Sequence, residues 1–263
     1  MTGKLIGRPD YGIDSPAMVI GELALAGVAG IGAWLLHALG DPHLLGIPVW
    51  GISLALGLYL LVMAGGMLDY SLRGKLRIRD LALRSIAWSG HERVLDVGCG
   101  RGLLLVGAAQ RLTDGKAIGV DRWAPGAVSG NGPAAALRNA ELAGVADRVA
   151  VCDGDARKLP CPDATFDIAL SNFVLHELDT PAERAQMLRE ITRTLKPGGR
   201  VALVDFIFTG EAGRALRAQG MSDVQRTPAA GWFAFASFAL LTLGLGRLYL
   251  VTGVKGEGTP QSD

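Results

Sequence analysis

The stretch Val94-Leu95-Asp96-Val97-Gly98-Cys99-Gly100-Arg101-Gly102 decides the fold. Its apolar residues predict a buried parallel strand, and its glycines allow positive φ and a close approach of the backbone to a ligand. An apolar strand that ends in an acid and a glycine-rich turn is typical of a nucleotide-binding α/β unit. The stretch therefore predicts an enzyme with a cofactor-binding turn.

Alternating strand and helix patterns follow this turn. Apolar segments at 112–121, 148–152, 166–170 and 200–208 predict four further strands, and helical segments separate them. Thr180-Pro181-Ala182-Glu183 is a capping box with proline at the first helical position, so we expect a helix to begin there. The alternation predicts an α/β fold with a doubly wound, mostly parallel sheet.

Five motifs occur in the order and at the spacing of the class I S-adenosylmethionine-dependent methyltransferases, and residues 81–255 resemble that family. The motifs are residues 94–102, Gly119-Val120-Asp121, Gly154-Asp155-Ala156, residues 166–172, and Leu195-Lys196-Pro197-Gly198-Gly199. The resemblance implies a Rossmann-like, seven-stranded sheet whose last strand, at 248–254, is inserted between others. It also implies S-adenosylmethionine as the cofactor and S-adenosylhomocysteine as the product.

A dinucleotide is the alternative ligand for such a turn. Its pyrophosphate would face the negative charge of Asp96, whereas the ammonium and sulfonium groups of S-adenosylmethionine would be attracted to that charge. The turn also reads Gly-x-Gly-x-Gly, without the wider final spacing of the dinucleotide fingerprint. Both observations favour S-adenosylmethionine.

The resemblance implies a role for each residue of the turn. The methionine part of the donor would lie beside the turn, with its amino group near Asp96. The turn residues in this role are Gly98, Cys99, Gly100 and Gly102.

The nucleoside part of the donor would be held by residues at later strand ends. Asp121 would accept both ribose hydroxyls, because an ionised carboxylate has two oxygens for paired donors. Asp155, next to Ala156, would accept the adenine amino group, with Asp153 as its competitor. A solvated strand end or a helix cap is the alternative for each acid. The remaining residues expected near the cofactor are Trp123, Ser171 and Asn172.

His176 is the candidate catalytic residue. Methyl transfer is a direct displacement, so an enzyme works largely by holding the reacting atoms in line, and a general base is optional. The unperturbed pKa of histidine lies near neutrality, so His176 is suited to take a proton from a hydroxyl, thiol or amine. Packing or pairing is the equally open alternative for this side chain.

Two apolar segments precede the methyltransferase-like region. Residues 17–39 and 47–68 are each about 22 residues long, and a helix needs about 20 to cross the hydrocarbon of a bilayer. Gly40-Asp41-Pro42-His43 between them reads as a short turn, so we expect a transmembrane hairpin. A signal peptide and a buried helical pair are the alternatives.

The positions of basic residues predict the orientation of this hairpin. Lys4 and Arg8 precede the first segment, and the connecting turn has no Lys or Arg. Five basic residues follow the second segment: Arg73, Lys75, Arg77, Arg79 and Arg84. The positive-inside rule then predicts a multi-pass protein of the cell membrane, with both flanks and the catalytic domain in the cytoplasm. The net charge of +1 argues against a nucleic-acid partner.

The domain organisation follows from these segments. We expect a cytoplasmic N-terminal segment at 1–16, the hairpin at 17–70, the methyltransferase domain at 71–255 and a disordered tail at 256–263. The apolar, aromatic residues 231–246 form either an insert on the membrane that roofs the active site or, with the strand after them, a third span. Cys152 and Cys161 lack metal-ligand spacing, so we expect no metal site.

The sequence thus predicts an integral-membrane S-adenosylmethionine-dependent methyltransferase. Its acceptor would be a small or lipidic molecule with an oxygen, nitrogen or sulfur nucleophile, reached from the bilayer. Methylation of a membrane protein or peptide is a second hypothesis. A non-catalytic sensor or assembly factor that binds S-adenosylmethionine is a third. The acceptor atom and the oligomeric state are left open by the sequence.

Overall fold

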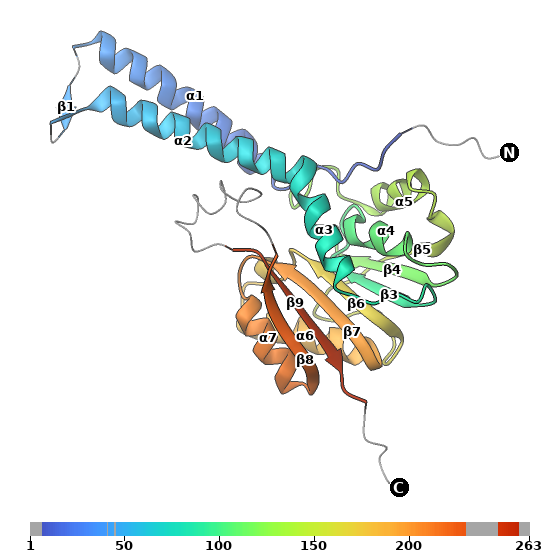
Figure 1. Ribbon diagram of the computed structural model, residues 1–263. Coiled ribbons are helices and arrows are strands. Elements are labelled where there is room, and N and C mark those ends of the chain that lie inside the picture. The colour runs from blue at the N-terminus through green and yellow to red at the C-terminus, as the bar shows by residue number, and fades with distance from the viewer. Residues whose placement is uncertain (1–6, 41, 45, 230–246, 258–263) are drawn as a thin grey trace, which may run out of the picture.

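The computed structural model describes residues 7–40, 42–44, 46–229 and 247–257. Figure 1 shows an α/β domain from which a long helical hairpin projects. The N-terminal segment runs past the base of the hairpin before it enters the first helix. The predicted insert at 231–246 lies outside the described residues, as does most of the predicted tail.

The α/β domain is built on a seven-stranded, mostly parallel sheet, which confirms the predicted fold class. The strand order is β5-β4-β3-β6-β7-β9-β8, and only β9 runs antiparallel to its two neighbours. The strands are β3 Arg93–Val97, β4 Lys116–Asp121, β5 Val149–Asp153, β6 Phe166–Asn172, β7 Leu195–Asp205, β8 Met221–Pro228 and β9 Tyr249–Lys255. The insertion of β9 between β7 and β8 agrees with the expected last strand.

Helices cover both faces of the sheet and bury its apolar side chains. On one face lie α3 Lys75–Arg84, α4 Leu103–Ala109 and α5 Pro133–Leu142, whose buried residues join one core cluster. On the other face lie α6 Pro181–Thr194 and α7 Thr209–Ala218, which form a second cluster with the sheet. The predicted capping box begins α6, because Thr180 accepts from the Glu183 amide and Glu183 accepts from the Thr180 amide. Two short 3₁₀ turns, Ala146–Arg148 and Leu175–Glu177, complete the domain.

The hairpin consists of α1 Pro16–Ala38 and α2 Val49–Asp69, with two short paired strands, His43–Leu44 and Ile47–Pro48, at its tip. Small residues let the helices approach closely: a Cβ on Gly57 would lie 3.3 Å from the Ala26 carbonyl oxygen. The Ser53 hydroxyl donates to the carbonyl oxygen of Ala29 across the same contact at 3.0 Å. Both helices are long and apolar enough to cross a membrane, and most of their surface is exposed.

The second hairpin helix continues into the α/β domain without a loop. A π-helical turn, Tyr70–Gly74, joins α2 directly to α3. The buried residues Ile78, Ala82 and Leu83 of α3 pack in the core of the domain. The hairpin and the sheet are therefore connected by one continuous helical segment (Figure 1).

Two predicted strand boundaries differ from the observed ones. The strand expected at 112–121 begins only at Lys116, because the amides of Thr113 and Gly115 turn back to donate to the Gly90 carbonyl oxygen. The strand expected at 200–208 begins at Leu195 and ends at Asp205. It ends there because Phe208 takes the left-handed conformation, with φ of 60°, just before α7.

Gly119, in the middle of β4, tests how tightly the glycine-rich turn packs on the sheet. A Cβ at this position would lie 2.6 Å from Cys99 Sγ and 2.9 Å from Leu105 Cδ2. We expect Gly119→Ala to destabilise the protein by roughly 1–3 kcal/mol, because overpacking a closed core forces its neighbours to shift. A lower thermal midpoint for purified Gly119→Ala than for the unaltered chain would show this loss.

Gly210→Ala in α7 is the matched control, since the nearest atom to its added Cβ is Arg214 Nη1 at 3.8 Å. We expect this control to leave the midpoint unchanged or to raise it, because alanine favours a helix over glycine. Equal midpoints for Gly119→Ala and the unaltered chain would contradict the tight packing of the turn.

Candidate functional site

A cavity of about 270 Å³ lies at the carboxyl ends of the central parallel strands. This edge of a doubly wound sheet is where α/β proteins bind their ligands. Five parts of the chain line the cavity: the glycine-rich turn, the strand ends, the base of the hairpin, the segment before α1 and the loop after β4. From the first two parts come Gly98, Cys99, Gly100, Asp121, Asp155, Ala156, Asn172 and His176.

The glycine-rich turn forms one wall of the cavity and needs glycine for two separate reasons. Gly98 has a φ of +72°, and a Cβ there would lie 2.2 Å from Val174 Cγ2, so no larger residue fits. At Gly100, with a φ of +50°, the nearest atom to an added Cβ is Asn131 Oδ1 at 3.9 Å. The turn thus packs tightly on Val174 at Gly98, whereas Gly100 is required for its positive φ rather than for space.

Asp121 holds the glycine-rich turn in place. Its Oδ2 accepts a hydrogen bond from the Gly100 amide at 2.7 Å, and its Oδ1 accepts from the Trp123 amide at 2.6 Å. The carboxylate lines the cavity, and each of its oxygens has a further lone pair. Asp121 is therefore placed as the predicted ribose ligand requires, and that role stays a prediction.

Asp96 lies behind the turn rather than in the lining of the cavity. It is 1% exposed, and its Oδ2 has no hydrogen-bond partner among the described residues. Burial raises the pKa of Asp96 to about 8, with an opposing effect from the Leu105 amide and a smaller raising effect from Asp121. An uncharged, buried carboxyl is the state that this environment favours when no cation is near.

Asp155 and Ala156 line the opposite part of the cavity. Asp155 is paired with Arg157, whose Nη2 lies 2.6 Å from Asp155 Oδ2, and Arg157 also pairs with Glu183. The hydrogen bond from Arg157 lowers the pKa of Asp155, so this acid remains ionised. Its predicted contact with adenine would have to be made alongside the guanidinium.

Besides Asp96, three further residues expected near the cofactor lie outside the lining of the cavity. Gly102 begins α4, and Ser171 is 3% exposed within β6. Trp123 turns away with a φ of +55°, and its indole N–H donates to Asp153 Oδ1. Asp153, the competitor of Asp155 in the sequence, is thus engaged by Trp123.

His176 lies in the 3₁₀ turn after β6 and faces the cavity. Its Nδ1 is 3.3 Å from Oδ2 of Asp205, the last residue of β7, and its ring lies 4.8 Å from that of Phe206. Burial lowers the pKa of His176, but the hydrogen bond and charge of Asp205, with the charge of Glu177, outweigh it and raise that pKa. The histidine is therefore held by a buried acid at one ring nitrogen and lines the cavity.

Asp205 was not singled out by sequence reasoning. It is fully buried, and its Oδ1 accepts from the amides of Phe206 and Ile207, which fixes the carboxylate beneath His176. The sequence did contain a pattern that indicates Asp205, because this acid ends an apolar strand in the same way as Asp121 does. The pairing with His176 could not be read from the sequence, since it joins residues 29 positions apart.

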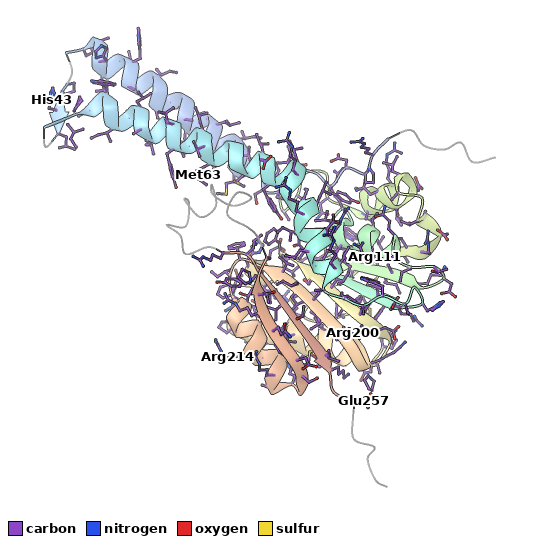
Figure 2. All side chains as sticks on the ribbon, in the orientation of Figure 1. His43, Met63, Arg111, Arg200, Arg214 and Glu257 are labelled. Atoms are coloured by element: carbon purple, nitrogen blue, oxygen red, sulfur yellow. The ribbon has the colours of Figure 1, made fainter. Side chains whose placement is uncertain are left out.

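The base of the hairpin also lines the cavity, which the sequence did not predict. Met63, Gly66 and Met67 of α2 and Tyr70 of the π-helical turn contribute to its walls. Figure 2 labels Met63, which lies in the half of α2 nearer to the α/β domain. The Tyr70 ring packs edge-on against Phe173, with centroids 5.6 Å apart. One cavity thus joins the hairpin to the glycine-rich turn.

Comparison with protein families identifies the central part of the chain. Residues 95–203 match a family described as "Methyltransferase domain". This part of the chain is thus similar to a methyltransferase domain. The demethylmenaquinone methyltransferase of Lactiplantibacillus plantarum is 34% identical over 128 residues, which are 48% of this chain and 50% of that protein. The chain spans about half the length of the curated relatives that it matches.

Solved structures share the fold of the domain. The [4+2]-cyclase SpnF is similar with a TM-score of 0.56 and 23% identity, over 70% of this chain and 81% of that one. The geranyl diphosphate C-methyltransferase of Streptomyces coelicolor, solved with S-adenosyl-L-homocysteine, gives a TM-score of 0.54 and 15% identity, over 67% and 76% of the two chains. A cyclase and a methyltransferase thus share this fold, so the fold alone does not distinguish between the two activities.

The raised pKa of Asp96 predicts a pH-dependent stability. The unfolded carboxyl ionises near pH 4, whereas the folded one keeps its proton up to about pH 8. The folded state then binds more protons between these values, so stability falls as pH rises, by up to about 1.4 kcal/mol per pH unit. We expect Asp96→Asn, which cannot ionise, to remove this slope in thermal midpoints measured from pH 5 to pH 8 without donor.

Asp223→Asn, at an exposed position on β8, is the control and should keep the slope of the unaltered chain. An identical slope in Asp96→Asn would show that Asp96 is already ionised in the free protein.

Proposed function

We propose that this protein is an integral-membrane S-adenosylmethionine-dependent methyltransferase that acts on a small or lipidic acceptor. The hairpin would span the cell membrane, and the α/β domain would lie at its cytoplasmic face. The observation that carries the proposal is the continuous cavity between the glycine-rich turn and the apolar side chains of Met63 and Met67.

The surface of the hairpin supports a membrane location. Large apolar side chains point outward along both helices, among them Ile20 and Val28, each 67% exposed, and Trp34, 68% exposed. A continuous apolar surface of this kind is unfavourable in water and favourable in a bilayer. The basic residues lie at the end of the hairpin that joins the α/β domain, which favours the cytoplasmic orientation.

The donor site fits S-adenosylmethionine by its chemistry. Burial raises the pKa of Asp96 behind the turn, and a cation bound in front of the turn would lower that pKa again; the donor carries two cationic groups. Asp121 and Asp155 supply acceptors for its hydroxyl and amino groups. Asn131 adds a buried side-chain oxygen to the lining that has no partner among the residues described. When bound, S-adenosylmethionine supplies a methyl carbon activated by its sulfonium.

The acceptor end of the cavity combines apolar walls with the His176–Asp205 pair. Met63, Met67 and the rings of Tyr70 and Phe173 are suited to bind an apolar molecule. His176 would take the proton of an acceptor hydroxyl, amine or thiol as the acceptor binds the methyl carbon and the bond from that carbon to the donor sulfur breaks. Asp205 would stabilise the imidazolium that results. The name of the demethylmenaquinone methyltransferase above supports a small or lipidic acceptor.

The direct test is product analysis. The full-length chain is purified with its native lipids, incubated with S-adenosylmethionine that carries an isotopically labelled methyl group, and its organic extract is analysed by mass spectrometry. We expect label in a small or lipidic molecule of the extract. Removing the hairpin should abolish that transfer, because Met63 and Met67 would be lost from the cavity.

Other outcomes would identify the alternatives. Label in protein rather than in the organic extract would indicate methylation of a membrane protein or peptide. Binding of S-adenosylhomocysteine without label in any acceptor would indicate a sensor. Full activity of the detached α/β domain on a polar, soluble acceptor would exclude delivery from the membrane.

The His176–Asp205 pair predicts the pH dependence of turnover. Neutral His176 is the active form, so the rate should fall as pH drops through its raised pKa. We expect His176→Gln to lower kcat by roughly 100-fold with little change in S-adenosylhomocysteine affinity. Asp205→Asn should move the acidic limb of the kcat profile to lower pH, because the charge that raises the pKa is removed.

His91→Gln is the control, because His91 lies in an exposed pair with Asp114 before β3. It should keep both kcat and the pH profile. An acidic limb that does not move in Asp205→Asn would show that another group titrates.

A further inference from the structure

The six residues before α1, residues 10–15, form a segment that we call the N-terminal strap. The strap lies between the hairpin and the loop that follows β4, and it enters α1 directly at Pro16. Tyr11, Asp14 and Ser15 of the strap line the cavity. None of its contacts was predicted from the sequence, where these residues belong to a flanking segment.

The first residue of the strap is fixed to the glycine-rich turn and to α5. Arg101, inside the turn, donates to the Asp10 carbonyl oxygen at 2.9 Å and pairs with its carboxylate at 2.7 Å. Asn139 of α5 donates to the same carbonyl oxygen at 2.7 Å and accepts from the Asp10 amide at 2.8 Å. Arg101 thereby ties the strap to the turn that forms the donor wall.

The middle of the strap pairs with the loop after β4. The Ile13 amide donates to Ser129 Oγ at 2.8 Å, and the Ser129 amide donates to the Ile13 carbonyl oxygen at 2.9 Å. The Ser15 amide donates to the Ala127 carbonyl oxygen at 3.0 Å. Gly12 has a φ of +72°, and a Cβ there would lie 2.7 Å from the Ser129 carbonyl oxygen. The strap therefore lies flat against this loop.

Lys75, the first residue of α3, holds the strap from the hairpin side. Its ammonium donates to the carbonyl oxygens of Tyr11, at 2.8 Å, and Gly12, and it pairs with Asp14 Oδ2 at 3.1 Å. Ser71 donates to the same Asp14 oxygen at 3.0 Å. Lys75 is only 4% exposed, and a buried ammonium is tolerated only when oxygens surround it. These oxygens all come from the strap.

The strap and the donor residues enclose the same space. Asp14, Ser15 and Lys75 line the cavity together with Gly100 and Asp121. A donor that contacts the turn and Asp121 therefore also faces the strap. The strap contributes to donor binding only while Lys75 and Arg101 keep it against the domain.

We propose that the N-terminal strap is a wall of the donor pocket and that Lys75 is the positioning residue that holds this wall in place. The inference rests on the proposed function in one respect, the identity of the donor as S-adenosylmethionine. Donor affinity then depends on a lysine at the foot of the hairpin and on residues that precede the hairpin in the sequence.

The first experiment measures binding of S-adenosylhomocysteine by calorimetry, with the full-length chain in lipid nanodiscs. We expect Lys75→Met, which keeps the aliphatic stem and removes the ammonium, to raise Kd by roughly tenfold or more. Lys116→Met is the matched control, because Lys116 is exposed at the opposite end of β4 and its ammonium donates to the Asp147 carbonyl oxygen. Its Kd should be unchanged.

Two further variants separate positioning from folding. Gly12→Ala keeps the Lys75 side chain but pushes the strap away from Ser129. It should therefore also weaken binding. Asp14→Asn should weaken binding alone but add little to Lys75→Met, because both remove the same ion pair. Hydrogen exchange supplies the second readout: S-adenosylhomocysteine should slow exchange of the strap amides in the unaltered chain and not in Lys75→Met.

The outcomes distinguish this inference from the proposed function. If the unaltered chain does not bind S-adenosylhomocysteine, the donor assignment fails. If it binds, and folded Lys75→Met and Gly12→Ala both bind within twofold of it, the strap is no wall of the pocket and the inference is overturned. Should Lys75→Met fail to fold, the Kd and hydrogen exchange of Gly12→Ala decide.

Discussion

The site depends on how the glycine-rich turn is tied to the end of β4. The Gly98 amide donates to the Val120 carbonyl oxygen at 2.8 Å, and the Gly100 amide donates to Asp121 Oδ2 at 2.7 Å. These two bonds fold the turn back over the neighbouring strand and open the cavity beside it. They also explain why Gly119 must be small, since the turn sits directly on it. The cavity would close or distort without this tie.

The core of the α/β domain could be predicted from sequence because its determinants are local. Strands, glycines and strand-end acids follow one another within short segments, and their order fixes the parallel sheet. The two hairpin helices could also be predicted, from the length and apolar composition of their segments. The observed start of β4 was missed because it depends on amides that turn back to Gly90, a contact with no local pattern.

The rest of the site could not be predicted because long-range contacts assemble it. Asp10 and Asn139 are 129 residues apart in sequence, and Lys75 lies more than 60 residues after the strap residues that it binds. Lys75 contributed to the sequence analysis only as a topogenic charge. Its burial shows that a basic residue beside an apolar helix can serve the interior of the adjoining domain as well. Asp205 shows the same limit, since its partner is defined only by the fold.

The continuous helix from α2 through the π-helical turn into α3 has a mechanical consequence. A flexible linker would let a tethered domain rotate and sample many heights above a bilayer. This connection is instead helical throughout, and the domain core is built around its end at Ile78, Ala82 and Leu83. On the proposed membrane location, the cavity would keep a fixed height and tilt relative to the lipid surface. The protein and a lipidic acceptor would then meet by diffusion in the plane of the bilayer, with the mouth of the cavity held in one orientation to the lipid.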